Sequence, residues 1–261
     1  TGPTGLFLNY ADSGERSAHG PMSCMFWLAR QYKNAAIGDA EHALIEKSRA
    51  SAEHIIWYVP PSGETAKPLE LDRWFHSPVD IIVMRSAWDD PNALFVGVKG
   101  GYNRVNHGHL DLGNFELDAL GVRWARDLGS DDYNLPGYFH NRKGGMRWKY
   151  YRMKSESHSV PLIGSKGQDE NGTSTVLDFQ STPTAARVTI DLTSAYNGPA
   201  KRVVRDVAIT NNRRAIIVRD RVETSSPADV VWGMTTDAEI GVGEHGTAML
   251  TLDGKKLRAS I

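Results

Sequence analysis

The feature that most constrains the fold of this chain is a succession of short β-branched segments beginning at residue 79. Turn residues, such as Asn171-Gly172 and Asn197-Gly198, separate them. Many strands at this spacing predict an antiparallel sandwich or barrel, because a parallel sheet needs crossover helices for which the chain has no room after residue 79. The expected strands lie within 79–86, 93–100, 114–120, 122–128, 158–164, 174–179, 186–192, 202–210, 215–222, 229–235 and 248–254.

Residues 1 to about 60 have a helical pattern instead. Apolar residues recur at spacings of three and four at Met22, Met25, Phe26, Ala29 and Tyr32. A second helix is expected over 38–59, with Asp39 as its cap and the prolines after Val59 as its end. We therefore predict an α+β, mostly β protein with a helical segment at 1–62, a linker at 63–78 and an antiparallel β-sandwich at 79–261.

Composition excludes several classes of protein. The 261 residues carry a formal net charge of −1, so any preference for an anionic partner must come from a local patch. One cysteine, Cys24, rules out an intrachain disulfide, and no apolar run approaches the roughly 20 residues of a membrane span. The chain starts at Thr1 without a signal peptide and ends in a hairpin around Asp253-Gly254, so we expect a fragment or processed piece truncated at its C-terminus.

The chemistry concentrates between residues 106 and 139, expected to form strand, turn, strand and loop. His107 and His109 would share one face of a strand, Asp127 ends a second apolar run, and His158 lies in a further strand-like segment. His109, Asp127 and His158 together suit a divalent metal of the zinc type, which leaves His107 beside the metal for chemistry.

Other interpretations of these residues remain open. A lone strand histidine is more often a satisfied structural residue than a ligand, and the spacing matches no dedicated motif such as HExxH. A calcium site at Asp127, Asp131 and Asp132 is a further alternative, although its spacing is not that of an EF-hand loop. A serine hydrolase is disfavoured because Ser13, Ser17 and Ser86 lack a glycine elbow.

Cations and aromatic rings alternate in residues 133–155, which contain no acidic residue. The residues expected to contact a sugar polymer there are Arg147, Trp148, Tyr150 and Arg152. Such a mixture also suits nucleic acid, and the alternative without a binding function is a solvated basic loop. Tyr138 has two interpretations: a proton carrier whose pKa a nearby cation lowers, or a loop aromatic packed on Pro136.

The run from Arg85 to His158 resembles the heparinase II/III-like polysaccharide lyases. The resemblance rests on RSAWDDPNALFVGVKGG, on NHGHLDLGNFELDALGVRWARDLGSDDYNLPGYF, on RWKYYR and SHSVPLIG, and on the early FLNYADSGER. It implies the end of an (α/α) toroid followed by a large β-sandwich. It also implies a mainly structural zinc ion on His109, Asp127 and His158, with Asn106, His107 and Tyr138 at the substrate cleft.

Lyases of this family split acidic polysaccharides by β-elimination. A base removes the C5 proton of a uronate, O4 leaves from C4, and neutralising the sugar carboxylate eases the first step. The expected partner is thus an acidic polysaccharide such as alginate or a glycosaminoglycan, with no nucleic acid, and Arg152 and its neighbours would hold its anionic groups. The resemblance further implies a bacterial periplasmic or secreted protein.

This sequence also departs from the family pattern. The family supplies a further tyrosine, and an asparagine or histidine, from the toroid, and neither Tyr10 nor Tyr32 lies in the motif expected for that tyrosine. His158 is followed by Ser159 and Val160 rather than by the usual Asn-Thr. The piece in hand could therefore be catalytically incomplete, so a non-catalytic carbohydrate-binding module with structural zinc is the main alternative function. A zinc hydrolase is a third.

Overall fold

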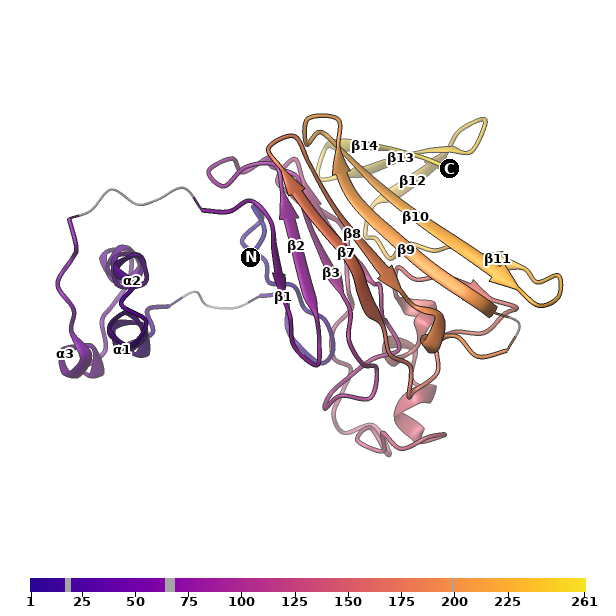
Figure 1. Cartoon of the computed structure of the whole chain (residues 1–261), viewed down its shortest axis with the longest axis horizontal. Helices are drawn as coiled ribbons and strands as arrows, with labels where there is room; N and C mark the ends of the chain where they lie inside the picture. The colour runs from indigo at the N-terminus through magenta and orange to yellow at the C-terminus, as the bar shows by residue number, and fades with distance from the viewer. Residues whose placement is uncertain (17–19, 64–68, 199) are drawn as a thin grey trace. The chain divides into compact units, whose positions relative to one another are not determined.

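A computed structural model of the protein describes residues 1–16, 20–63, 69–198 and 200–261. The chain divides into two compact units. Ser17–Leu69 forms a helical unit, and Thr1–Arg16 joins Glu70–Ile261 in a β unit (Figure 1). The first sixteen residues therefore belong with the sheets, and not with the helical segment expected over 1–62. Residues 64–68 of the expected linker lie outside the described residues, whereas its later part already contains the first strand, β1 (Arg73–Phe75).

The helical unit consists of α1 (Cys24–Gln31), α2 (Ala35–Glu46) and α3 (Glu53–Trp57). Phe26 and Ala29 are its buried apolar positions on α1, as the spacing predicts. The cap expected at Asp39 is wrong: the side chain of Asn34 accepts the Ala36 N–H and caps α2 there, whereas Asp39 lies inside the helix. Among the described residues, no helix has the length and apolar character required to cross a bilayer.

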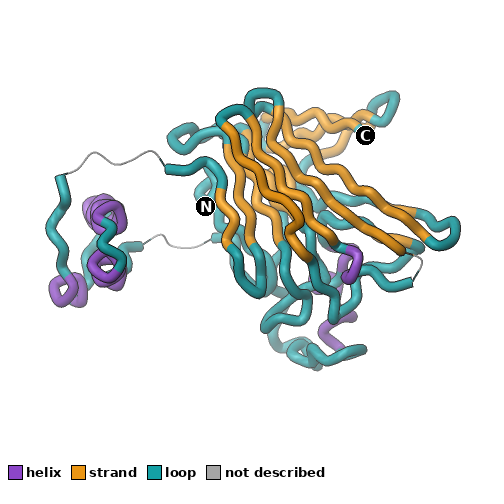
Figure 2. The backbone as a smooth tube through the Cα atoms, viewed as in Figure 1, coloured by secondary structure: helices purple, strands orange, loops and turns teal. Residues whose placement is uncertain are grey.

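Every strand pairing among the described residues of the β unit is antiparallel. Strands are the main regular structure of this unit (Figure 2), which confirms the predicted fold class. A five-stranded sheet has the order β1-β2-β3-β4-β5, with β2 at Ile81–Arg85, β3 at Phe95–Lys99, β4 at Phe115–Ala119 and β5 at Val122–Ala125. A four-stranded sheet has the order β10-β9-β8-β7, with β7 at Thr175–Thr182, β8 at Ala185–Asp191, β9 at Ala200–Thr210 and β10 at Ala215–Thr224.

Two smaller sheets complete this unit. The first pairs β6 (Leu162–Ile163) with β11 (Val230–Val231). The second has the order β12-β13-β14, with β12 at Glu239–Val242, β13 at Thr247–Leu252 and β14 at Lys255–Ser260. The turn predicted at Asp253-Gly254 joins β13 to β14, and both residues have the positive φ that such a two-residue turn requires.

One apolar core joins the two large sheets. Alternate residues of the five-stranded sheet, such as Met84 and Val96, belong to the same buried cluster as Val188 and Ile209 of the four-stranded sheet. This shared core is the sandwich arrangement, in which each sheet buries one face against the other.

Residues 1–16, here called the strap, run across the other face of the five-stranded sheet. Asn9 donates its backbone N–H to Glu116 of β4 (2.9 Å), and Arg123 of β5 donates to the carbonyl of Phe7 (2.7 Å). Gly97 of β3 leaves room for Leu8, because a Cβ there would lie 2.5 Å from both Leu8 methyl carbons. The strap explains why β3 and β4 are buried on both faces.

The connections that carry the candidate site are mostly irregular. The chain between β5 and β6 contains three single 3₁₀ turns, η1 (Met146–Lys149), η2 (Tyr151–Met153) and η3 (Ser155–Ser157), and a fourth, η4 (Thr193–Ala195), follows β8. His107 and His109 lie in the connection between β3 and β4, not on a strand, and His158 directly follows η3. The expected strand positions of these three histidines were therefore wrong.

Candidate metal centre

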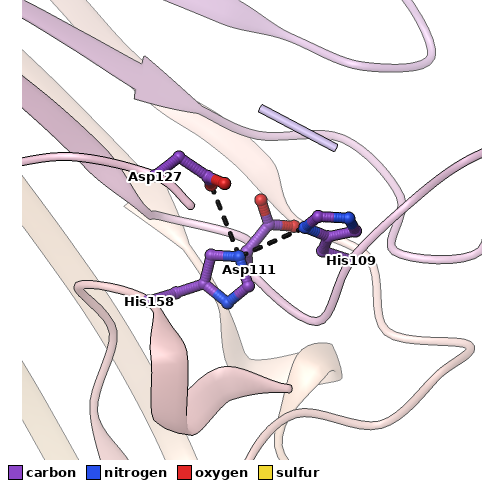
Figure 3. A group of neighbouring side chains, drawn as sticks. All are labelled: His109, Asp111, Asp127 and His158. Carbon is purple, nitrogen blue, oxygen red and sulfur yellow. Dashed lines mark hydrogen bonds and ion pairs between the residues drawn. The ribbon is translucent and has the colours of Figure 1, made fainter. Parts of the chain in front are cut away.

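Four buried side chains converge in the β unit: His109, Asp111, Asp127 and His158 (Figure 3). Each offers one ligand atom, and these atoms all lie within 4.8 Å of one another. The three residues predicted as metal ligands are thus brought together from three separate segments. Asp111 joins them from the connection that also carries His109.

Asp127 is held in place before any metal is considered. It lies two residues after β5, and its Oδ1 accepts the backbone N–H of Gly129 (2.7 Å). Its Oδ2 accepts the side-chain amide of Asn114 (2.8 Å) and lies 3.4 Å from Nε2 of His158. Asn114 also accepts the backbone N–H of Ser159, which ties the Asp127 and His158 segments together.

The hydrogen bonds around the two histidines assign their tautomers. Nδ1 of His158 lies 2.6 Å from the carbonyl of Lys154, and Nε2 of His109 lies 3.0 Å from a carboxylate oxygen of Asp12. Both partners are acceptors, so these nitrogens carry the protons. The opposite nitrogens, Nε2 of His158 and Nδ1 of His109, face each other at 3.3 Å and are the ring atoms that point into the cluster.

Charge in the cluster also favours a cation. Asp111 pairs one oxygen with the buried Lys99, while its other oxygen is buried without a hydrogen-bond partner among the described residues. Burial lowers the pKa of His109. Burial opposes protonation of His158 as well, but the Asp127 carboxylate outweighs it and raises the pKa of His158. The pocket therefore attracts positive charge, and this donor set of imidazoles and carboxylates fits a divalent metal of the zinc type.

His107 lies outside this cluster and faces solvent. Its Nδ1 is 2.8 Å from Oδ2 of Asp12, and its side chain is 39% exposed. The backbone at His107 has a φ of 59°, and a Cβ on Gly108 would lie 2.0 Å from the carbonyl oxygen of Asn103. This tight turn separates the two histidines, because it directs His109 inward and His107 outward.

Exposed side chains surround His107. Tyr133 stacks on its ring at 6.0 Å between centroids, and Phe139 meets it edge-on at 5.9 Å. Both aromatic rings are about half exposed, at 45% and 55%. Asn106, which directly precedes His107, is exposed as well.

Tyr138 is buried and differs from the expected proton carrier. Its hydroxyl donates to Asp12 at 2.6 Å, and burial together with this carboxylate raises the pKa of Tyr138 to about 12. The expectation that a nearby cation lowers this pKa was wrong, even though the Arg147 guanidinium lies 4.8 Å from the ring centroid. At neutral pH the phenol keeps its proton and acts as a hydrogen-bond donor.

The four predicted sugar contacts are largely engaged inside the protein. Arg147 is buried and donates to carbonyls of His107, Gly108 and Tyr138 and to Asp12. Trp148 is buried, with its Nε1 directed to the carbonyls of Asn141 and Arg142. The expectation of direct sugar contacts at these two residues is corrected, because solvent does not reach them.

The remaining two predicted contacts are half-buried. The Tyr150 hydroxyl donates to the carbonyl of Pro136 (2.5 Å), and Arg152 donates to the carbonyls of Leu128 (2.8 Å) and Ser130 (2.7 Å). These hydrogen bonds fix the loop after β5. The cations of this region that are exposed are Arg142, Lys143 and Lys149, and Arg104 is exposed three residues before His107.

Sequence reasoning did not identify Asp12, Asn114 or Tyr133 as members of the site. Asp12 comes from the strap, 95 residues before His107 and 135 before Arg147. No spacing rule connects positions so far apart. The only signal was the place of Asp12 within FLNYADSGER, one of the pieces on which the family resemblance rests.

The chain is similar to several solved structures. A heparan sulfate lyase HepC mutant from Pedobacter heparinus matches with a TM-score of 0.69 and 16% identity, over 96% of this chain and 35% of that chain. A heparinase III with methylated lysines matches with a TM-score of 0.71 and 17% identity, over 98% of this chain and 35% of that chain. These likenesses show the fold, and this chain spans about a third of the length of each of these two proteins.

Sequence comparison leads to the same group of proteins. No curated protein sequence matches the chain. The family model described as heparinase II/III-like, C-terminal, matches residues 83–260, which confirms the resemblance stated above. This chain belongs to the heparinase II/III-like family and carries the C-terminal domain of that family.

Proposed function

We propose that this chain is the β-sandwich part of a polysaccharide lyase that cleaves a uronate-containing glycosaminoglycan by β-elimination. The observation that carries the proposal is the exposed imidazole of His107, held by Asp12 beside a buried cluster suited to a metal. Family membership supports the lyase class. The names of the similar structures, heparan sulfate lyase and heparinase III, point to a sulfated substrate.

His107 has the geometry of a proton-transfer group. Its Nδ1 donates to Asp12, so Nε2 carries the lone pair on the side away from that carboxylate. That nitrogen would accept the C5 proton of the uronate, or return a proton to the departing O4. Asn106 would hydrogen-bond the sugar carboxylate and lower the cost of the C5 carbanion.

The ligands His109, Asp127 and His158, with Asp111 close enough to be a fourth, would hold a zinc ion. The cluster is buried, whereas His107 is exposed. Zinc there would fix the connections that carry His107 rather than touch the sugar. β-Elimination needs no activated water, so a structural ion suffices.

The exposed side chains around His107 and in the loop after β5 are the candidates for contact with the substrate. Tyr133 and Phe139 present ring faces and edges beside His107, suited to the apolar faces of sugar rings. Arg104 and the exposed cations of the loop after β5 would pair with carboxylate or sulfate groups. Arg147 and Tyr138 would act indirectly, through Asp12. A bacterial periplasmic or secreted location fits this substrate class.

The test uses the full-length protein that contains this chain, incubated with heparan sulfate, heparin, alginate and other uronate polymers. Each cleavage creates a C4–C5 double bond with a new ultraviolet absorption. We expect His107→Ala to lower the rate at least about 100-fold, the lower range for loss of a general acid or base, with bound zinc unchanged. His245→Ala, at a remote histidine whose side chain is 94% exposed, is the matched control and should retain full activity.

Two results would overturn this assignment: no unsaturated product with any polymer, or loss of zinc in His107→Ala. Binding of an oligouronate without turnover by the full-length protein would instead favour the second candidate, a non-catalytic carbohydrate-binding module. That candidate gains weight because this chain spans only about a third of the length of the two similar structures, so most of the helical toroid is not represented in it.

A further inference from the structure

Asp12 lies where the strap meets the candidate site. It follows Ala11, whose φ of 62° places it in a tight turn, and its side chain is only 2% exposed. The carboxylate receives four hydrogen bonds from segments far along the chain. Oδ2 accepts from His107 (2.8 Å), and Oδ1 accepts from His109 (3.0 Å), Tyr138 (2.6 Å) and Arg147 (2.9 Å).

The two oxygens serve two imidazoles with opposite orientations. A carboxylate accepts hydrogen bonds, so both contacting ring nitrogens carry their protons. His109 therefore presents its unprotonated Nδ1 to His158 and the buried cluster. His107 therefore presents its unprotonated Nε2 outward. One carboxylate thus sets the tautomer of a metal-cluster histidine and of the exposed histidine.

Tyr138 and Arg147 keep this carboxylate from rotating. Arg147 donates through the same Nη2 to Asp12 (2.9 Å) and to the carbonyl of His107 (3.0 Å). A rotation of the carboxylate would break these contacts together with both histidine contacts. The arrangement is therefore one connected network, in which movement of one imidazole is transmitted to the other.

We propose that Asp12 is a positioning residue that couples metal binding at His109, Asp127 and His158 to the orientation of His107. A metal would fix the His109 ring through Nδ1, and this ring would in turn hold Oδ1 of Asp12. Loss of the metal would loosen His109, then Asp12, then His107. The coupling stands on hydrogen-bond geometry, and its consequence for turnover rests on the role proposed above for His107.

The experiment measures histidine tautomers by two-dimensional ¹⁵N NMR of the full chain, with Zn²⁺ and after its removal by EDTA. In the zinc-loaded protein, His107 should show one tautomer, protonated at Nδ1. After chelation, the same ring should show a mixture of both tautomers. This comparison needs no substitution and no substrate. An unchanged single tautomer of His107 in the chelated protein would overturn the coupling.

Asp12→Asn provides the second arm, with Glu15→Gln as a matched carboxylate-to-amide control on the same strap. Glu15 pairs with Arg126 at 2.7 Å, and within the described part of the chain its side chain makes no hydrogen bond or ion pair with a member of the cluster. Loss of a partner that orients a metal ligand typically costs 10- to 100-fold in metal affinity, and we expect that loss in Asp12→Asn only. Its His107 should show mixed tautomers even with saturating Zn²⁺. Wild-type zinc affinity and one His107 tautomer in Asp12→Asn would contradict the proposal.

Lyase kinetics separate this inference from the proposed function. If the wild type cleaves a uronate polymer, kcat should fall in Asp12→Asn far more than KM rises, because sugar-contacting groups stay in place. If the wild type cleaves nothing while the tautomer changes occur, the lyase assignment fails and the coupling by Asp12 stands. If activity is present and the tautomers do not respond, the coupling fails alone.

Discussion

His107 and His109 are two residues apart, yet they occupy different environments. The positive φ of His107 and the close approach of Gly108 to Asn103 turn the chain sharply between them. A regular strand would have placed both imidazoles on one face. The turn instead directs one imidazole into a buried cluster and leaves the other accessible to solvent, as the proposed structural metal site and proton-transfer group would require.

Tyr138 gives a prediction for alkaline pH. Its pKa is about 12 in the folded protein, because of burial and the Asp12 carboxylate, against an ordinary value of about 10. A pKa raised by folding contributes stability that is complete below about pH 10 and is lost as pH rises through about 12. The free energy of unfolding should therefore fall by about 2 to 3 kcal/mol from this residue over that range.

Urea unfolding of the wild type and of Tyr138→Phe at a series of pH values measures this contribution. The curve of the variant should be flatter between about pH 10 and 12. Burial also raises the pKa of Tyr10 and Tyr196, but both proteins share these residues, so their difference isolates Tyr138. Parallel curves would show that Tyr138 titrates normally.

Within the β unit, the strap hydrogen-bonds to buried polar side chains of the five-stranded sheet. It covers the outer face of β3, β4 and β5, which carries buried ionisable side chains such as Glu116, Asp118 and Arg123. Thr4 donates to Asp118 (2.6 Å), and Asn9 donates its backbone N–H to Glu116 (2.9 Å). Arg123 pairs with both carboxylates within the sheet, and the strap supplies the further hydrogen bonds that these buried groups would otherwise lack.

The contact between Leu8 and Gly97 tests how the strap is seated. Gly97→Ala would place a methyl group 2.5 Å from the Leu8 methyl carbons, and overpacking of this kind typically costs about 1–3 kcal/mol. The double variant Leu8→Ala, Gly97→Ala should recover part of that loss. A cycle with both single variants, followed by urea unfolding, gives the coupling energy. Strictly additive effects would show that Leu8 does not occupy the space beside Gly97.

The elements also show what sequence patterns could predict. Strands such as 81–85, 95–99 and 185–191 were predicted because β-branched residues and turn residues mark them locally. The burial of Arg147 and Trp148 within residues 133–155 was not predicted, because the short 3₁₀ turn that carries them has no periodic pattern of apolar residues. A basic, aromatic composition does not reveal that backbone carbonyls satisfy these side chains.

The candidate site shows the same limit. The ligands His109, Asp127 and His158 were proposed partly from residue type and partly from the family resemblance, and the fold brings them together. Asp12 was missed because its partners are 95 to 135 residues away. Asn114 was missed because its role depends on where Asp127 and Ser159 meet. Side chains that act by orienting others have no local signature.

For the whole molecule, we predict that metal removal affects the two units differently. The cluster lies entirely within the β unit. A ligand at 100 times its Kd stabilises the folded state by about 2.7 kcal/mol, so chelation should lower the thermal midpoint of the β unit while the helical transition stays in place. Circular dichroism during heating, with EDTA and after Zn²⁺ is restored, measures both.

His158→Ala is the variant for this experiment, because its β-unit midpoint should no longer respond to EDTA. His245→Ala should respond as the wild type does. A midpoint of the wild-type β unit that is identical with and without EDTA would show that the cluster contributes no metal-dependent stability.

The chain order of the two units has a consequence for biosynthesis. Asp12 emerges from the ribosome before the helices, and Arg147 follows 135 residues later. At a synthesis rate of about 5–20 residues per second, Arg147 is added to the chain about 7 to 27 seconds after Asp12. A nascent chain can therefore complete its helices before the strands on which the strap lies have been synthesised.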